Sequence, residues 1–334
     1  NVLDYDYFFK VTDTLLTGVH PVNINTGNLN ADNKPEIVVD YATGNTSNDS
    51  ISYFVNNGSG LFGNRTSLFV ISFQTQNRVP VIADINNDNF GDIVCHSVTD
   101  MQPFINNGSL VFTAPPVFFI GQYSSRILVA DVNNDNKVDL VNSSEDQGGV
   151  TVQLGNGNGT FQSYNVYSAN GSPNDMLLAD FDGDTRKDAL CVHRTKDYIS
   201  FLKGQTDGSF GPFELRTALR PKSLAVGLMN GDVYEDLVVC NSQSQKVSVM
   251  LGNSDGTFQV TINDSCFTGM QDVVLADFNN DTKTDAVVIG STSNILMGDG
   301  TGHLIVQGSF NQGFFIGGEY FAVAGKFNSD NNYD

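Results

Sequence analysis

The chain has 334 residues and a formal net charge of −20, from 37 acidic and 17 basic residues. The basic residues are few and scattered, which argues against nucleic-acid binding, and no apolar run approaches the roughly 18 residues of a membrane span. Residue 1 is not Met and no apolar signal segment follows it, so we expect a mature or excised portion of a protein.

Short apolar runs and turn residues alternate along the chain in a repeated order. In each period one apolar run enters an acidic, Asn-rich nonapeptide, a second leaves it, a third alternates up to a Gly/Asn turn, and a fourth follows that turn. The entering runs include 79–85, 126–132, 176–181 and 273–278, and the leaving runs include 92–95, 236–240 and 285–289. Four short runs with tight turns predict four antiparallel strands per period.

The fourth run begins at the same kind of residue in most periods. These residues are Phe62, Phe112, Phe161, Phe210, Phe258 and Leu304. Apolar residues at regular positions usually pack in a core, so we interpret them as core residues rather than as a platform for ligand stacking. No segment has a helical period, because Gly and Asn interrupt every candidate.

The spacing of the nonapeptides predicts the fold. Their first residues are 28, 84, 131, 180, 228, 277 and 326, which gives steps of 56, 47, 49, 48, 49 and 49 residues. A period of about 40–50 residues built from strands is typical of a β-propeller. We predict an all-β fold, a seven-bladed β-propeller of four-stranded antiparallel blades, as a single domain over residues 1–334. The repeats would begin near residues 20, 79, 126, 175, 223, 272 and 320.

The nonapeptides have the donor chemistry of calcium loops between the first two strands. Ca²⁺ takes six to eight oxygen ligands from carboxylates, amides and backbone carbonyls on a tightly curled segment. Side-chain oxygens at loop positions 1, 3, 5 and 9, with the carbonyl of position 7, meet that need. Four copies carry the full set: Asp84, Asn86, Asp88 and Asp92; Asp131, Asn133, Asp135 and Asp139; Asp180, Asp182, Asp184 and Asp188; Asp277, Asn279, Asp281 and Asp285.

Three copies lack part of this set and are predicted to be weak or empty. They contain Asn28, Asn30, Asp32 and Glu36; Asn230, Asp232 and Asp236 after Leu228; and Asn328, Asp330 and Asp334 after Lys326. For a single copy the alternative is an Asn/Asp-rich turn that hydrogen-bonds its own backbone without metal. Four complete sets in one register favour Ca²⁺. Position 6 must curl sharply, and it is occupied by Asn33, Asn89, Asn136 and Asn331, which tolerate positive φ.

These motifs together resemble a known family. The nonapeptide followed by Leu/Ile-Val, with Leu-Gly-Asn-x-x-Gly-Thr-Phe at 154–161 and 251–258, is similar to FG-GAP/VCBS repeats and to blades of the integrin α-subunit propeller. The resemblance covers nearly the whole chain. It implies a seven-bladed propeller with Ca²⁺ in the blade loops, as in adhesion receptors, propeller lectins and other extracellular modules. It implies no single activity, because one fold hosts many functions.

The two ends of the chain leave the last predicted blade incomplete. Residues 8–16 resemble a fourth strand, and residues 320–334 resemble a first strand with its loop. Two explanations remain open. Either the natural protein continues past Asp334, or another chain supplies the missing strand and builds a filament by strand sharing.

Sequons and calcium chemistry indicate an extracellular protein, secreted or at the cell surface. Asn57, Asn107 and Asn158 lie in the turn between the third and fourth strands of three blades, as surface acceptors should. The predicted glycosylation sites are Asn45, Asn48, Asn57, Asn64, Asn107, Asn142, Asn158, Asn170 and Asn263. Cys95, Cys191 and Cys240 are expected to be buried apolar residues, and Cys240–Cys266 is the only disulfide considered.

The function predicted from the sequence is an adhesion or ligand-recognition module for an extracellular protein or a carbohydrate. The alternative is a structural repeat unit of a glycosylated filament or matrix that self-associates through the last blade. A polysaccharide lyase or dehydratase is less favoured, because none of the four histidines has a nucleophile motif beside it. The chain is therefore not expected to be an enzyme. The absence of Trp slightly disfavours sugar binding.

Overall fold

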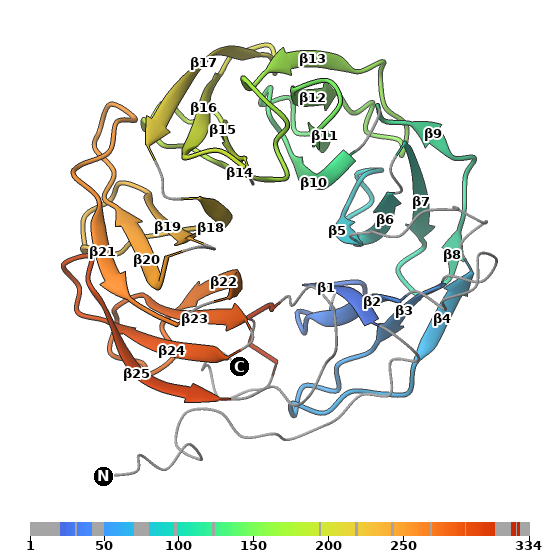
Figure 1. The fold of residues 1–334 in the computed structure, drawn as a ribbon. Coiled ribbons are helices and arrows are strands. Elements are labelled where there is room, and N and C mark those ends of the chain that lie inside the picture. Colours follow the sequence, from blue (N-terminus) through green and yellow to red (C-terminus); the bar gives the residue numbers. More distant parts are fainter. Residues whose placement is uncertain are drawn as a thin grey trace.

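The computed structural model describes residues 21–30, 32–41, 50–69, 80–96, 99–121, 124–193, 195–217, 220–241, 244–267, 269–290, 292–310, 322–324 and 326–327. These residues form six β-sheets, arranged as the blades of a propeller around a common centre (Figure 1). Within each blade, neighbouring strands pair antiparallel in sequence order, which confirms the predicted four-stranded meander.

The first three blades differ slightly in size. The first contains β1 (Pro21–Gly27), β2 (Glu36–Tyr41), β3 (Ser50–Phe54) and β4 (Thr66–Phe69). The second contains β5 (Val81–Ala83), β6 (Asp92–His96), β7 (Asp100–Asn106), β8 (Phe112–Thr113) and β9 (Phe118–Phe119). The third contains β10 (Ser124–Ala130), β11 (Asp139–Ser144), β12 (Gly149–Gln153) and β13 (Asn165–Ser168). In the second blade, β8 and β9 both pair with β7 and together take the place of the fourth strand.

The other three blades follow the same order. The fourth contains β14 (Asp175–Ala179), β15 (Asp188–Val192), β16 (Tyr198–Gly204) and β17 (Phe210–Thr217). The fifth contains β18 (Pro221–Gly227), β19 (Asp236–Asn241), β20 (Lys246–Met250) and β21 (Ile262–Ser265). The sixth contains β22 (Met270–Ala276), β23 (Asp285–Gly290), β24 (Ser293–Gly298) and β25 (Leu304–Phe310). The first strand of each blade lies nearest the centre of the ring (Figure 1).

Burial explains why the leaving runs are apolar throughout. The second strand is buried along its whole length in β6, β11, β15, β19 and β23. Both faces of a blade pack against neighbouring blades, so such a strand has no solvent-facing side and shows no alternation. Most residues of the outer strands β13 and β21 are exposed or half-buried, as the polar character of their sequences indicates.

The residues after the Gly/Asn turns pack between blades, which confirms their predicted place in the core. Phe210 and Leu304 are buried. Phe258 of the fifth blade lies edge-on to Phe181 of the fourth, with ring centroids 5.7 Å apart. The others are partly buried against further core clusters: Phe62, Phe112 and Phe161.

The described residues form six blades where seven were expected. Of the ends assigned to the seventh blade, residues 8–16 and 320–334, the structure describes only residues 322–324 and 326–327. The described C-terminal residues lie between the sixth and the first blade. Ala322 packs against the cluster that contains Val274 of β22, and Phe327 meets Phe62 of the first blade, with ring centroids 5.6 Å apart.

The position of Phe327 repeats a contact found between neighbouring blades. Asn106 of the second blade donates its side-chain N–H to the carbonyl of Leu29, at position 2 of the first loop, over 2.5 Å. Asn56 of the first blade donates in the same way to the carbonyl of Phe327, at position 2 of the last nonapeptide, over 3.0 Å. Phe327 therefore meets the first blade as a preceding blade would.

Two further observations bear on the sequence-based expectations. All four cysteines are free and buried, so Cys240 and Cys266, whose pairing the sequence left open, do not form a disulfide. No helix within the described part of the chain is long and apolar enough to cross a membrane.

Candidate calcium loops

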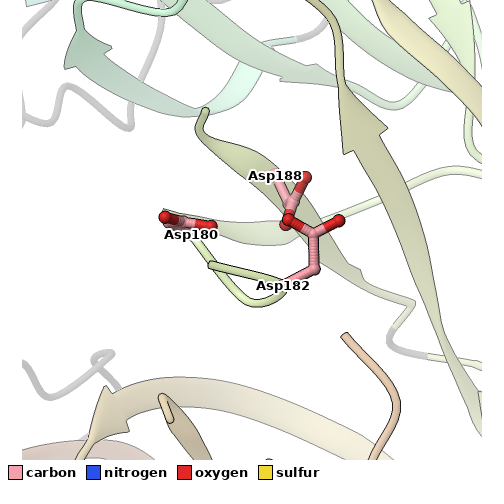
Figure 2. A group of neighbouring side chains, drawn as sticks. All are labelled: Asp180, Asp182 and Asp188. Carbon is pink, nitrogen blue, oxygen red and sulfur yellow. The ribbon is translucent and has the colours of Figure 1, made fainter. Parts of the chain in front are cut away.

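In each of the six described blades a nonapeptide connects the first strand to the second, and each loop is named below by its first residue. The Asp180 loop joins β14 to β15. Ligand atoms of Asp180, Asp182 and Asp188 lie within 4.8 Å of one another, and Figure 2 shows Asp182 beside Asp188 with the Asp180 carboxylate directed toward them. The structure thus brings together three residues predicted to share one ion.

The carboxylate at position 1 holds the loop in shape by accepting hydrogen bonds from backbone N–H groups of the same loop. In the Asp180 loop, one oxygen accepts the N–H of Asp184 at 3.1 Å and the other accepts the N–H of Thr185 at 2.8 Å. Asp84, Asp131 and Asp277 accept the N–H groups of positions 5 and 6 of their own loops in the same way. Positions 3 and 5 also accept backbone N–H groups in all four loops. The four complete copies therefore share one conformation.

The curl of the loop needs positive φ at two positions. At position 6 the expectation is confirmed for Asn33, Asn89 and Asn136, with φ of 61°, 70° and 63°, whereas Asn331 lies outside the described residues. Thr185 and Thr282 also adopt φ of 69° there, which is strained for a β-branched residue. Position 4 is left-handed as well, a feature that the sequence analysis missed: Asn87, Asn134, Gly183, Gly231 and Asn280.

Position 9 has a structural role that the ligand pattern alone did not reveal. Asp188 is fully buried, and its two oxygens accept the N–H groups of Phe181 at 3.1 Å and Gly204 at 2.8 Å. It thereby joins the start of its loop to the end of β16. The same pair of contacts, to position 2 and to the end of the third strand, is made by Asp92, Asp139, Asp236 and Asp285.

Burial makes these position 9 carboxylates unusually basic. Desolvation raises the pKa of Asp92 and of Asp188 to about 6, although the two backbone N–H donors at each oppose the shift. Burial likewise raises the pKa of Asp139, Asp236 and Asp285. The nearby loop carboxylates add to the rise in all five cases, so a bound cation would relieve a repulsion that is built into the loop.

Basic side chains already lie beside some loops. Lys203 of β16 contacts the carboxylates of Asp182 and Asp184, and Arg186 contacts Asp184. Burial raises the pKa of Asp182, but hydrogen bonds from Lys203 and from the backbone lower it by more, so the pKa lies below its usual value. In the Asp131 loop, Lys137 Nζ lies 3.4 Å from Asp135. The Asp180 loop is therefore the most strongly neutralised by the chain itself.

The three incomplete copies differ in the oxygen ligands that they could offer to a cation. In the first loop, Oδ1 of Asn28 is buried without a hydrogen-bond partner, while Glu36 accepts the N–H of Leu29 at 2.8 Å. An unpartnered oxygen at position 1 is what a cation would satisfy. In the fifth loop Leu228 offers no side-chain oxygen. The ligand positions Asn328, Asp330 and Asp334 of the last copy lie outside the described residues.

Most predicted glycosylation sites lie at the surface. The exposed ones are Asn57, Asn64, Asn107, Asn158, Asn170 and Asn263. Asn142 of β11 is fully buried, and its amide N–H donates to Thr151 Oγ1 at 3.1 Å. A glycan cannot be attached there in the folded chain, so this prediction was wrong. Asn45 and Asn48 lie outside the described residues.

The class of the protein follows from these observations: six antiparallel meanders packed face to face around one centre make a β-propeller. Its repeats can also be assigned. Residues 131–191 and 229–288 match the FG-GAP-like repeat. Each match runs from the loop of one blade to the second strand of the next. The chain thus carries FG-GAP-like repeats in two places, and its fold is consistent with FG-GAP propellers.

Solved structures with low sequence identity share the fold. One is an Agrocybe aegerita lectin described as recognising non-reducing terminal N-acetylglucosamine, with 19% identity, a TM-score of 0.63 and coverage of 87% of this chain and 80% of the lectin chain. A protein from Lactobacillus plantarum has 13% identity, a TM-score of 0.61 and coverage of 86% and 84%. BBS1N, solved in complex with ARL6DN, has 9% identity, a TM-score of 0.59 and coverage of 88% and 84%. No curated protein sequence matches this chain.

Proposed function

We propose that this chain is a calcium-stabilised, extracellular β-propeller that recognises a protein or carbohydrate ligand. The observation that carries the calcium part is the convergence of Asp180, Asp182 and Asp188, whose ligand atoms lie within 4.8 Å of one another. Hard oxygen donors on a curled loop are the ligands that Ca²⁺ prefers. The Asp84, Asp131 and Asp277 loops would bind in the same way, because their backbone hydrogen bonds are the same.

The residues that would hold the ion have separate tasks. Positions 1, 3 and 5 supply side-chain oxygens that are half-buried or exposed, whereas position 9 is buried and accepts two backbone N–H groups. A bound Ca²⁺ supplies positive charge that neutralises the converging carboxylates. The chain itself supplies the curl, through left-handed residues at positions 4 and 6. The first loop would be a fifth, weaker site on account of Asn28.

Recognition of a ligand is supported by what related folds bind. The Agrocybe aegerita lectin recognises N-acetylglucosamine, and BBS1N was solved bound to another protein. Loops at the surface of a rigid scaffold are the usual place for such contacts. Exposed sequons at Asn57, Asn107 and Asn158 support an extracellular location, where calcium is millimolar and sites of about 10⁻⁴–10⁻³ M are filled. We further propose that the chain has no catalytic activity.

The second candidate is a structural unit that assembles through a seventh blade. It is favoured by one observation, the contact of Phe327 with the first blade in the manner of a preceding blade. A seventh blade that begins with residues 322–327 would close the ring. Its remaining strands would come from the N-terminus, from residues beyond Asp334 or from another chain.

Binding arrays test the recognition proposal directly. The protein would be applied to glycan and extracellular-protein arrays in about 2 mM Ca²⁺ and again in excess chelator. Calcium-dependent binding to a defined ligand supports the proposal, and its absence on both arrays contradicts it. Asp277→Asn removes a ligand carboxylate from one loop, and Asp146→Asn, at an exposed turn outside the loops, is its matched control.

Electron microscopy of the native material tests the second candidate. Filaments whose repeat matches one propeller would support strand sharing. An intact mass that shows sequence beyond Asp334 sufficient for the missing strands, together with monomeric particles, would contradict it.

A further inference from the structure

The inner strands carry polar residues at one shared position, five residues before each loop. Four neighbouring blades place Arg126, Asp175, Ser223 and Asp272 there, at or near the beginning of β10, β14, β18 and β22. These side chains line one cavity of about 390 Å³ in the centre of the described ring. Its volume falls within the roughly 300–1,000 Å³ of small-molecule sites.

Asp272 is fully engaged by the protein. Its Oδ1 accepts the Ser223 hydroxyl at 2.9 Å and the N–H of Val273 at 2.9 Å. Its Oδ2 accepts the N–H of Ala322 at 3.2 Å, from the C-terminal segment. Asp272 therefore holds the wall of the cavity together, and its negative charge stays inside it.

Arg126 and Asp175 face each other without satisfying each other. Arg126 Nε lies 3.8 Å from Asp175 Oδ1, which is beyond a hydrogen bond, and this Nε is buried without a hydrogen-bond partner. Asp175 Oδ1 accepts the N–H of Met176 at 2.8 Å. Burial raises the pKa of Asp175, Arg126 lowers it and Asp272 raises it. The guanidinium of Arg126 and the carboxylate of Asp175 thus lie side by side in the wall of the cavity.

The rest of the lining sets the character of a ligand. The cavity has an apolar wall, which includes Leu128, Leu177 and Leu224. Lys187 is the fourth charged residue of the lining, so two cations and two carboxylates balance. A ligand of zero net charge with separated charges matches this balance, whereas a simple anion or cation does not.

We propose that this central cavity binds a small zwitterion, a free α-amino acid with an apolar side chain. Its carboxylate would accept from the guanidinium of Arg126, whose side chain is 36% exposed, its ammonium would donate to Asp175, and its side chain would lie on the leucine wall. The site contains no calcium-loop ligand, so the inference goes beyond the proposed calcium-dependent recognition of proteins or carbohydrates.

Calorimetric titration with L-leucine, in millimolar calcium and again in chelator, tests this proposal. Two analogues each lack one charge: isovalerate has no ammonium and isoamylamine has no carboxylate. We expect leucine to bind at least about tenfold more tightly than either analogue. No binding of leucine to the wild-type protein, or equal binding of either analogue, would overturn the proposal without any variant.

Substitutions then assign the charges. Asp175→Asn should weaken the binding of leucine and isoamylamine at least about tenfold and leave the binding of isovalerate unchanged. Arg126→Gln should weaken the binding of leucine and isovalerate and leave the binding of isoamylamine unchanged. Asp146→Asn, at an exposed turn that is not part of the cavity lining, is the matched control and should bind like wild type. Unchanged leucine binding by folded Asp175→Asn would place the amino acid elsewhere and overturn the assignment.

Discussion

The Asp180 and Leu228 loops occupy the same place in neighbouring blades, but they make the same hydrogen bonds only at their last residue, position 9. Both end in a fully buried aspartate. Asp188 accepts the N–H groups of Phe181 and Gly204, and Asp236 accepts those of Met229 and Gly252, at 2.6 and 2.8 Å. The link between the loop and the third strand is therefore the same in a complete loop and in a degraded one.

The beginnings of the two loops differ. Leu228 is 45% exposed and has no side-chain oxygen to accept the backbone N–H groups of positions 5 and 6, as Asp180 does in its loop. At position 6, Thr185 is left-handed, whereas Val233 is 81% exposed and is not among the residues with positive φ. The comparison teaches that the nonapeptide combines two functions. Position 9 holds the blade together, and positions 1 to 5 carry the remaining side-chain oxygens of the proposed cation site, which a blade can lose while keeping its fold.

The largest expected effect is that of removing calcium, which should destabilise the complete loops and leave the Leu228 loop unaffected. Each complete loop would lose about 1.4 kcal/mol of stabilisation at an ion concentration ten times its dissociation constant, so four loops would lose about 6 kcal/mol. Scanning calorimetry in about 10 mM Ca²⁺ and in excess chelator measures the difference. An identical melting temperature in both would show that the complete loops do not bind structural calcium.

The buried aspartate should matter equally in both loops. Asp188→Ala and Asp236→Ala each leave two buried N–H groups without an acceptor, which costs about 3 kcal/mol. Denaturant unfolding in chelator measures this without a contribution from calcium. Asp146→Ala, exposed between β11 and β12, is the control and should be neutral. A neutral Asp236→Ala would contradict the structural role of position 9.

Restoring position 1 should convert the degraded loop toward a complete one. Leu228→Asp supplies a carboxylate that can accept the backbone N–H groups of positions 5 and 6. It also supplies a ligand oxygen beside those of Asn230 and Asp232. We expect one more bound Ca²⁺ per chain and about 1 kcal/mol of added stability in calcium. Leu228→Ala is the control, since it removes the leucine without adding oxygen. Unchanged calcium stoichiometry in Leu228→Asp would mean that position 6 decides the site.

A smaller, pH-dependent effect follows from the buried carboxylates. The pKa of Asp92 and of Asp188 is about 6 in the folded chain and about 3.9 when unfolded, so the folded state binds the proton more tightly. The stability gained from protonation is complete below about pH 4 and is lost as the pH rises through about 6. In chelator, melting at pH 5 should therefore occur at a higher temperature than at pH 7.

Calcium should remove this pH dependence, because a bound cation favours the ionised carboxylates. The comparison of Asp188→Asn with wild type isolates the contribution of one loop. A melting temperature in chelator that falls between pH 7 and pH 5 would show that other groups dominate the titration.

The smallest effect concerns backbone strain at position 6. Thr185 and Thr282 have φ of 69°, which Asn adopts at lower cost than a β-branched residue. Thr185→Asn and Thr282→Asn should each raise the free energy of unfolding by about 0.5 kcal/mol. Denaturant titration measures the gain. No gain at either position would indicate that the threonine side chain contributes contacts equal to the strain.

The sequence predicted the local architecture well because its signals are local. The strand order, the interblade place of Phe258 and the left-handed Asn89 all follow from periodicity and from the steric limits of short loops. Asn142 was mistaken for a surface acceptor, because the sequon pattern is blind to the burial of β11. The role of Asp188 was only half-recognised, because its second N–H partner lies on another strand.

What the sequence by itself determined is the unit: a four-stranded blade, repeated about every 49 residues, with an oxygen-rich loop after its first strand. Repetition and alternation depend on neighbours along the chain, so they can be read from it. Only the tertiary structure decided what the units do to one another. The ring brings Arg126, Asp175 and Asp272 from three blades to one cavity, and it places Phe327 against the first blade. Such contacts depend on the angle between blades, which no single repeat encodes.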